Sequence, residues 1–388
     1  MKTTRRRTIT AVFALLLVLG AGVGGFVAWR ERGIVRILVI LTDPESEILI
    51  PMLQELGSKT RIRDVRITRS HSFAQLESDF SRRWSGTDIV IGPSGYYLTQ
   101  FMEQGRIAPV LLGSGFPSAV LGAVSYEATT YAVPIVWSPR GLYFSREITG
   151  VLQFSDVDEF LLALSAARDQ NVQALVMPGF QHGTVFDLFV SLYGDQSAVE
   201  LGRWIQNDLA LPPPEPLPEL FQRFQSLFEQ RVIPGSSDGF SREDVYTFLQ
   251  QGDAAIVFDD SFFSPLIPVD DRRRFRFSGP PLSGPRRPII PGRIVAAAVA
   301  PSSAERDIVR ELIASLGDPA FQYEISVASR GALMAVHSAA PVLDEYTRTA
   351  RRSLVIASAV LPSHLEWAAQ GDRERINDLI NGLLIPIP

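Results

Sequence analysis

The sequence predicts an α/β protein with a mixed, mostly parallel sheet, and three observations support this prediction. Short β-rich runs alternate with amphipathic helical patterns along the chain, as in repeated βαβ units. The early runs at 35–41 and 88–91 each end in a loop that precedes a helical pattern. A chain of 388 residues, 46% hydrophobic and 20% charged, is also long enough to form two hydrophobic cores.

Periodicity places the individual elements. Strands are expected at 35–41, 64–68, 88–91, 174–177, 254–258 and 294–300. Helices are expected at 46–56, 72–84, 184–193, 220–231, 241–250 and 303–316. Because ligands of parallel sheets bind beyond the carboxyl ends of the strands, the loops at 42–45 and 92–97 are the first candidates for a site.

One extended segment is too long for a single compact strand. Residues 131–147 read YAVPIVWSPRGLYFSRE and are interrupted by prolines. We expect this segment to cross between two parts of the protein. A second proline-rich stretch, at 211–218, is expected to be an extended surface loop, with a partner-docking segment as the alternative.

The first thirty residues carry an export signal. Lys2 and Arg5–Arg7 precede an apolar run at 11–29, and Arg30-Glu31-Arg32 follows it. This run of 19 residues falls within the ~17–25 residues that span a bilayer. We expect an uncleaved membrane anchor, with a cleaved signal peptide as the alternative. The basic cluster would stay cytoplasmic, which places the rest of the chain outside the cytoplasmic membrane.

Composition excludes several classes of function. Residues 1–32 hold six basic and one acidic residue, so 33–388 keep 31 basic against 41 acidic residues, and this acidity argues against nucleic acid as a partner. The absence of cysteine excludes disulfides, thiolate chemistry and a lipid-modified cysteine anchor. The four histidines show no metal-ligand spacing, and no cofactor motif occurs. Gly235–Gly239 matches G-x-S-x-G around Ser237 but lacks the strand before it, so no enzyme is predicted.

Four stretches in order resemble the family of bacterial extracellular solute-binding proteins of ABC importers, maltose-binding-like members included, over residues 35–388. They read DIVIGPSGYYLTQFMEQGRIAPV (88–110), YAVPIVWSPRGLYFSREI (131–148), FLQQGDAAIVFDDSFF (248–263) and VAPSSAERDIVRELIASLGDPAFQYEIS with GALMAV (299–336). The chain departs from the family pattern at three places. It lacks the lipobox cysteine, it has Asp260-Ser261-Phe262 where the family has "GPW", and it has Phe144-Ser145-Arg146-Glu147 where the family has "YNKD".

The resemblance implies the type II periplasmic-binding-protein fold, in which two α/β lobes are joined by a hinge. It implies a first lobe of 33–138 with about 289–322, and a second lobe of 139–288 with about 323–388, after the N-terminal segment 1–32. The hinge is expected near 136–141, with return crossings at 285–325. A small polar ligand, carbohydrate favoured, would close the hinge, and the closed receptor would deliver it to a transmembrane permease.

The resemblance also implies that ligand contacts come from the loops after the strands and from the crossing segment. A sugar needs aromatic rings for its apolar faces and carboxylates or amides for its hydroxyl groups. The positions that match are Asp43, Glu45, Ser94, Tyr96, Tyr97, Trp137, Ser138, Arg140, Phe180, Gln181, Asp259, Asp260 and Phe262. We expect Trp137→Ala to weaken ligand binding and to leave folding largely intact.

Several alternatives stay open at this point. Aromatic residues interleaved with acids also suit a polyamine. For each aromatic residue, ordinary core packing is the alternative role. Arg140 is equally suited to hold the hinge through a carboxylate, and Asp259 to cap the next turn. The protein itself has a second interpretation, a membrane-tethered sensor or scaffold on the same fold with no transported ligand.

Overall fold

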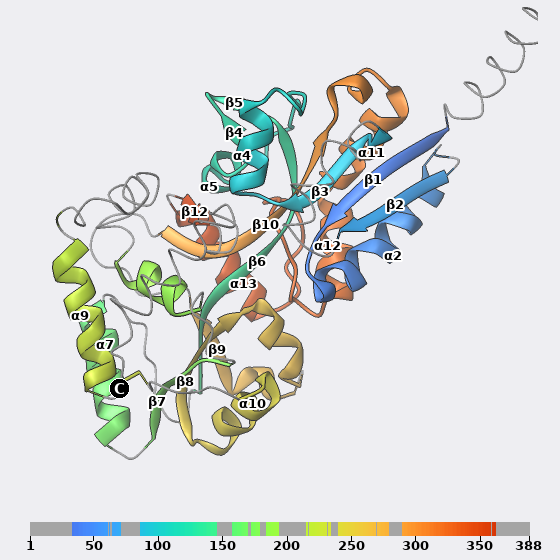
Figure 1. Ribbon diagram of the computed structural model, residues 1–388. Coiled ribbons are helices and arrows are strands. Elements are labelled where there is room, and N and C mark those ends of the chain that lie inside the picture. Colours follow the sequence, from blue (N-terminus) through green and yellow to red (C-terminus); the bar gives the residue numbers. More distant parts are fainter. Residues whose placement is uncertain are drawn as a thin grey trace, which may run out of the picture.

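The structure is a computed structural model, and it shows two groups of strands joined by one long strand (Figure 1). The residues that it describes are 33–60, 62, 64–70, 86–145, 157–169, 172–178, 184–193, 215, 217–230, 232–233, 240–268, 270–278, 289–357 and 359–361. The predicted N-terminal anchor, the predicted helix at 72–84 and the G-x-S-x-G motif lie outside these residues.

The first group of strands forms a mixed sheet in the order β2-β1-β3-β10-β6. Its strands are β1 (Ile34–Ile40), β2 (Asp64–Ser70), β3 (Ile89–Pro93), β6 (Ala132–Ser145) and β10 (Ile289–Val299). β1 runs parallel to both of its neighbours, whereas β10 is antiparallel to β3 and to β6. We call the part built on this sheet, with residues 132–138 of β6, the first lobe.

Helices cover both faces of the first sheet because its strands alternate their apolar side chains between two cores. Val35, Ile37 and Val39 pack in the core that also receives α2 (Asp43–Lys59), α11 (Asp307–Leu316) and α12 (Pro319–Ala328). On the opposite face, Leu38 and Ile40 pack against α4 (Tyr96–Glu103). Phe321 and Ile325 of α12, the helix that contains the predicted boundary near 322, also belong to the first of these cores. The domain boundaries themselves stay a prediction.

The strand β6 connects the two lobes, as the length of the segment 131–147 predicts. Its residues 132–139 pair with β10, and its residues 140–144 pair with β8 (Ala254–Asp260). Two further segments return along this crossing. β10 runs from a pairing with β12 (Ala359–Leu361) into the first sheet, and β11 (Met334–Ala335) pairs with Val136 and Trp137 of β6. The last crossing therefore lies some ten residues beyond the predicted range of 285–325.

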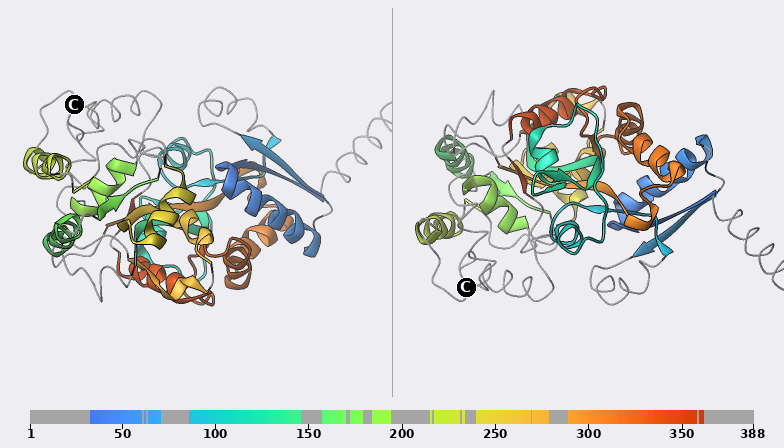
Figure 2. Two further views of the ribbon diagram at one scale, coloured as in Figure 1. Left: turned by 90° about the horizontal axis from the view of Figure 1, so that it is seen from below. Right: turned by 90° about the horizontal axis from the view of Figure 1, so that it is seen from above.

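The second lobe is built on residues 140–145 of β6, on β8, on β7 (Gln173–Val176) and on β9 (Phe275–Ser278). One face of this sheet is covered by α7 (Val157–Asp169), the helical residues 184–193 and α9 (Leu217–Glu229), around a phenylalanine-rich core. The other face meets α10 (Arg242–Gln251), α13 (Glu345–Ile356) and α5 (Ser118–Gly122). Figure 2 shows from two sides that α7 and α9 lie at one end of the molecule and α2 at the other.

The remaining elements are short. They are β4 (Ser125–Tyr126), β5 (Thr129–Thr130), η2 (Ser261–Leu266), η3 (Asp271–Arg273) and η4 (Pro301–Ser303). The predicted helix at 303–316 begins later in the structure, since η4 ends at Ser303 and α11 begins only at Asp307. α2 instead begins three residues before the predicted start, since Thr42 and Glu45 form a capping box there.

Candidate functional site

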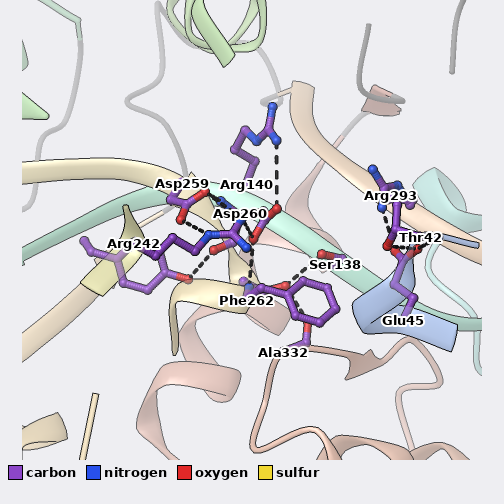
Figure 3. Close-up of polar contacts among 12 residues, drawn as sticks. Thr42, Glu45, Ser138, Arg140, Arg242, Asp259, Asp260, Phe262, Arg293 and Ala332 are labelled. Atoms are coloured by element: carbon purple, nitrogen blue, oxygen red, sulfur yellow. Dashed lines mark hydrogen bonds and ion pairs between the residues drawn. The ribbon is translucent and has the colours of Figure 1, made fainter. Parts of the chain in front are cut away.

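The candidate site lies where β6 passes between the lobes, and two serines join three segments there. Ser138 of β6 and Ser261, which follows β8, are both buried, and their hydroxyl oxygens lie 2.9 Å apart. The Ser261 hydroxyl donates to the backbone carbonyl of Ala332, so the hydroxyl of Ser138 donates to that of Ser261. Figure 3 shows Ser138 and Phe262 between two groups of charged side chains.

The charged group of the second lobe contains three carboxylates and two guanidinium groups. Arg140 pairs with Asp187 of the helical residues 184–193 and reaches Asp260 at 4.0 Å. Arg242, the first residue of α10, pairs with Asp259 at 2.7 Å and 3.1 Å and with Asp260 at 2.7 Å. Arg140 therefore has the structural pairing that the sequence left open for it. Such a network holds the turn after β8 in one geometry.

Burial and the neighbouring carboxylate of Asp260 raise the pKa of Asp259 to about 6, although Arg242 pulls it the other way. The backbone N–H of Asp260 donates to Asp259, and the Asp260 carboxylate accepts from the N–H of Phe262. Asp260, not Asp259, therefore caps the turn that follows β8.

The buried Tyr143 and the partly buried Tyr346 form a pair of tyrosines beside the same turn. The hydroxyl of Tyr143 lies 2.7 Å from that of Tyr346 and 3.1 Å from the carbonyl of Asp260, to which it donates. Burial raises the pKa of Tyr143 well above its usual value, and the Tyr346 hydroxyl adds to the shift. Burial also raises the pKa of Tyr346, so both phenols stay neutral; Tyr143 supports the turn directly and Tyr346 supports it through Tyr143.

The charged group of the first lobe is centred on Glu45. One carboxylate oxygen accepts from the N–H and the hydroxyl of Thr42, and the other lies 2.8 Å from Arg293 of β10. Glu45 is fully buried, so the pair with Arg293 compensates the removal of its charge from water. Asp43, two residues earlier, is instead exposed and pairs with Arg69 of β2.

The loop after β3 contributes backbone geometry. Ser94 is buried, and its N–H donates to the carbonyl of Ile294 at 2.7 Å. Gly95 has φ +136°, a value that favours glycine, and it turns the chain into α4. Tyr96 and Tyr97 are the first residues of α4, and the placement of their side chains is outside the described part of the structure.

The two described aromatic residues of the predicted set differ in their surroundings. Trp137 is 1% exposed and packs in a core with Ile294 and Met334, and its indole N–H has no partner among the described residues. Core packing, the alternative role, thus describes Trp137 in this conformation. Phe262 is partly buried, and it packs against the core of the first lobe although it follows a strand of the second. Phe180 and Gln181 lie outside the described residues.

Sequence reasoning missed the partners of the predicted charged residues. Arg293 and Arg242 lie 248 and 17 residues away from the carboxylates with which they pair, and Asp187 lies 47 residues away from Arg140. Adjacent acids at the end of a buried strand, such as Asp259 and Asp260, do signal that cations must lie nearby. No spacing rule, however, indicates which arginines these are.

The site therefore offers charged groups that are already paired. Each of the described carboxylates in the predicted set contacts an arginine, so a ligand would meet guanidinium donors beside carboxylate acceptors. Within the described residues, no cluster of three or more His, Asp or Glu side chains is arranged to hold a metal ion. The same residues include no helix that is both long and apolar enough to cross a membrane.

Comparison with known proteins gives a clear answer only for the fold. No family model and no curated protein matches the sequence. Among solved structures, the bacterial solute receptor AcbH, described as having an exclusive preference for β-D-galactopyranose, matches with a TM-score of 0.71 and 13% identity over 90% of each chain. The sugar-binding protein MalE from Xanthomonas citri matches with a TM-score of 0.66 and 12% identity, over 90% of this chain and 97% of that one.

A probable secreted solute-binding lipoprotein from Streptomyces coelicolor is similar as well, with a TM-score of 0.69 and 11% identity over 92% of this chain and 95% of that one. Identities this low show the fold alone. The chain has the α/β fold of the type II periplasmic binding proteins, and the three structures named are solute-binding receptors, not enzymes.

Proposed function

We propose that this chain, which has the fold of the sugar-binding solute receptors, is an extracytoplasmic receptor that delivers a small polar ligand to the permease of an ABC importer. The observation that carries this proposal is the convergence of three segments at β6. Thr42 and Glu45 follow β1, Ser138 and Arg140 lie on the crossing itself, and Phe262 follows β8. Ligand sites of open α/β sheets form at such carboxyl ends.

The paired charges favour a neutral carbohydrate over a polyamine. A polyamine binds through carboxylates whose charge is free to meet an ammonium group. Here Glu45 already pairs with Arg293, and Asp259 and Asp260 both contact Arg242, so each of these carboxylates already has a guanidinium partner. A sugar hydroxyl both donates and accepts, so it suits a surface on which guanidinium donors and carboxylate acceptors stand side by side.

Closure of the lobes about β6 is the mechanism that this arrangement supports. Three segments cross between the lobes, at β6, at β10 and near β11. Phe262 of the second lobe already packs on the core of the first, which is a contact of the kind that a closed form retains. A ligand that bridges Ser138 and both charged groups would favour the closed form through its extra contacts there.

The N-terminal sequence supports a place outside the cytoplasmic membrane. The basic cluster at Arg5–Arg7 and the apolar run at 11–29 suit either a retained anchor in the inner membrane or a cleaved signal peptide. In both cases the lobes reach the periplasmic or extracytoplasmic side, where a receptor meets its ligand before transport.

Thermal unfolding with a panel of neutral sugars, polyamines and organic anions tests this proposal. A true ligand at about 100 times its Kd adds about 2.7 kcal/mol of stability, which raises the Tm by several degrees. Ser138→Ala should weaken the binding of that ligand about tenfold, because one hydroxyl contact is lost. Ser165→Ala, which removes a partly buried hydroxyl on α7, is the matched control and should leave the affinity unchanged. A folded protein that no member of the panel stabilises would overturn the proposal and leave the sensor or scaffold interpretation.

A further inference from the structure

The chain enters the first lobe at a fixed point, at the amino end of β1. The carbonyl of Gly33 accepts from the N–H of Asp64 at 3.3 Å, and the carbonyl of Ile34 accepts from Arg306 at 2.7 Å. Ile34 is 6% exposed, and Val35 is fully buried. From Gly33 onward, the polypeptide is therefore part of the folded lobe.

The candidate site lies at the other end of the same strand. β1 has seven residues and leads directly to Thr42 and Glu45, so the entry point and the site are separated by about 23 Å along the strand. We call the end of the first sheet at which β1 begins the entry edge. The amino ends of β2 and β3 also lie there, because β1 is parallel to both strands. The start of α11 lies there as well, because Arg306 contacts Ile34.

The sequence leaves little chain between the predicted anchor and this edge. The apolar run ends at Trp29, and only Arg30, Glu31 and Arg32 precede Gly33. Even fully extended, the four residues from Arg30 to Gly33 reach about 14 Å. A helix is ~10–12 Å across, and helices cover both faces of the first sheet. A lobe that lay flat on a helix-covered face would thus require an almost fully stretched linker.

We infer that, when residues 11–29 remain attached, the entry edge of the first lobe faces the bilayer and the candidate site lies on the far side of that lobe. This inference rests on a retained anchor, one of the two N-terminal arrangements in the proposed function, and not on which ligand is bound. Among the described elements, α7 and α9 then lie at the end away from the membrane (Figure 1). A receptor in this orientation binds its ligand on the side away from the bilayer. Transfer to a permease in the same membrane then needs cleavage before Gly33 or a partner that reaches outward.

Resonance energy transfer from a dye on the protein to labelled lipid headgroups tests this orientation. The full-length chain has no cysteine, so one introduced cysteine is the only site for a thiol-reactive donor dye. Glu305→Cys, beside α11 at the entry edge, and Glu229→Cys, at the end of α9, are matched changes of exposed glutamates. In vesicles of phosphatidylcholine and phosphatidylglycerol, transfer should be at least about twofold higher from position 305, given the short linker and the length of the lobe.

A variant with a longer linker shows whether the short linker causes the difference in energy transfer between the two positions. A Gly/Ser insertion of about twelve residues between Arg32 and Gly33 should reduce the difference, because a flexible linker of that length lets the lobes lie flat. Equal transfer from both positions in the natural chain overturns the inference, as does a difference that the linker insertion leaves unchanged. Neither result bears on the thermal-shift test, so the orientation at the membrane and the receptor function can be refuted separately.

Discussion

Truncation of Trp137 separates a packing role from a binding role. Trp137 is 1% exposed, so its side chain is almost completely removed from water. Burial of ~150–250 Å² of tryptophan surface at about 25 cal/mol/Å² contributes roughly 4–6 kcal/mol to the free energy of unfolding. Trp137→Ala should therefore destabilise the fold by about 3–5 kcal/mol, the usual range for such core truncations. The structure thus leads to a different expectation from the sequence, which predicts weakened binding with folding largely intact.

Urea unfolding followed by far-ultraviolet circular dichroism measures this loss, and Trp137→Phe is the control. Phenylalanine keeps most of the apolar area and removes an indole N–H that has no partner among the described residues, so it should cost about 1 kcal/mol or less. If Trp137→Ala unfolds within about 1 kcal/mol of the parent while ligand affinity falls more than tenfold, the packing argument is refuted. Trp137 would then contact the ligand, as the sequence predicts.

Three further predictions concern the crossing and the charged group of the second lobe. Gly292→Ala would place a Cβ 2.4 Å from the indole nitrogen of Trp137, and it should cost about 1–3 kcal/mol in urea unfolding. Arg140→Met removes the guanidinium group that pairs with the buried carboxylate of Asp187 and should cost about 3–5 kcal/mol, which a second change, Asp187→Leu, should partly restore. The pKa of Asp259 is raised to about 6, so the native state keeps a proton that the unfolded chain loses. The stability from this carboxyl is complete below about pH 4 and is lost as the pH rises through about 6, and Asp259→Asn should flatten that decline in unfolding measured against pH.

The sequence predicted the elements that periodicity controls. The strands at 35–41 and 254–258 and the crossing at 131–147 lie where continuous apolar runs or proline-punctuated extended sequence placed them. Shifts at helix ends have local causes. α2 begins at Asp43 because Thr42 and Glu45 cap it, and α11 begins at Asp307 because the short turn η4 precedes it.

The candidate site was less predictable, because its geometry depends on partners that are distant in sequence. A carboxylate at the end of a strand has the same local sequence whether it faces a ligand or an arginine of another segment. Glu45 and Arg293 meet only because β10 inserts beside β3 at the edge where β1 ends. Trp137 shows the same limit, since its neighbours Ile294 and Met334 come from the two returning segments.

The position of β10 also sets the order in which the protein can fold. β10 lies between β3 and β6, so the first sheet remains interrupted until residues 289–299 have been synthesised. Contacts that join such distant segments form slowly, because a long loop must close before they add stability. The first lobe, although it begins at the amino terminus, cannot be completed before three quarters of the chain has been made. If the chain is exported as proposed, this delay would keep the first lobe incomplete, and so able to be threaded, while the leading end enters an export channel.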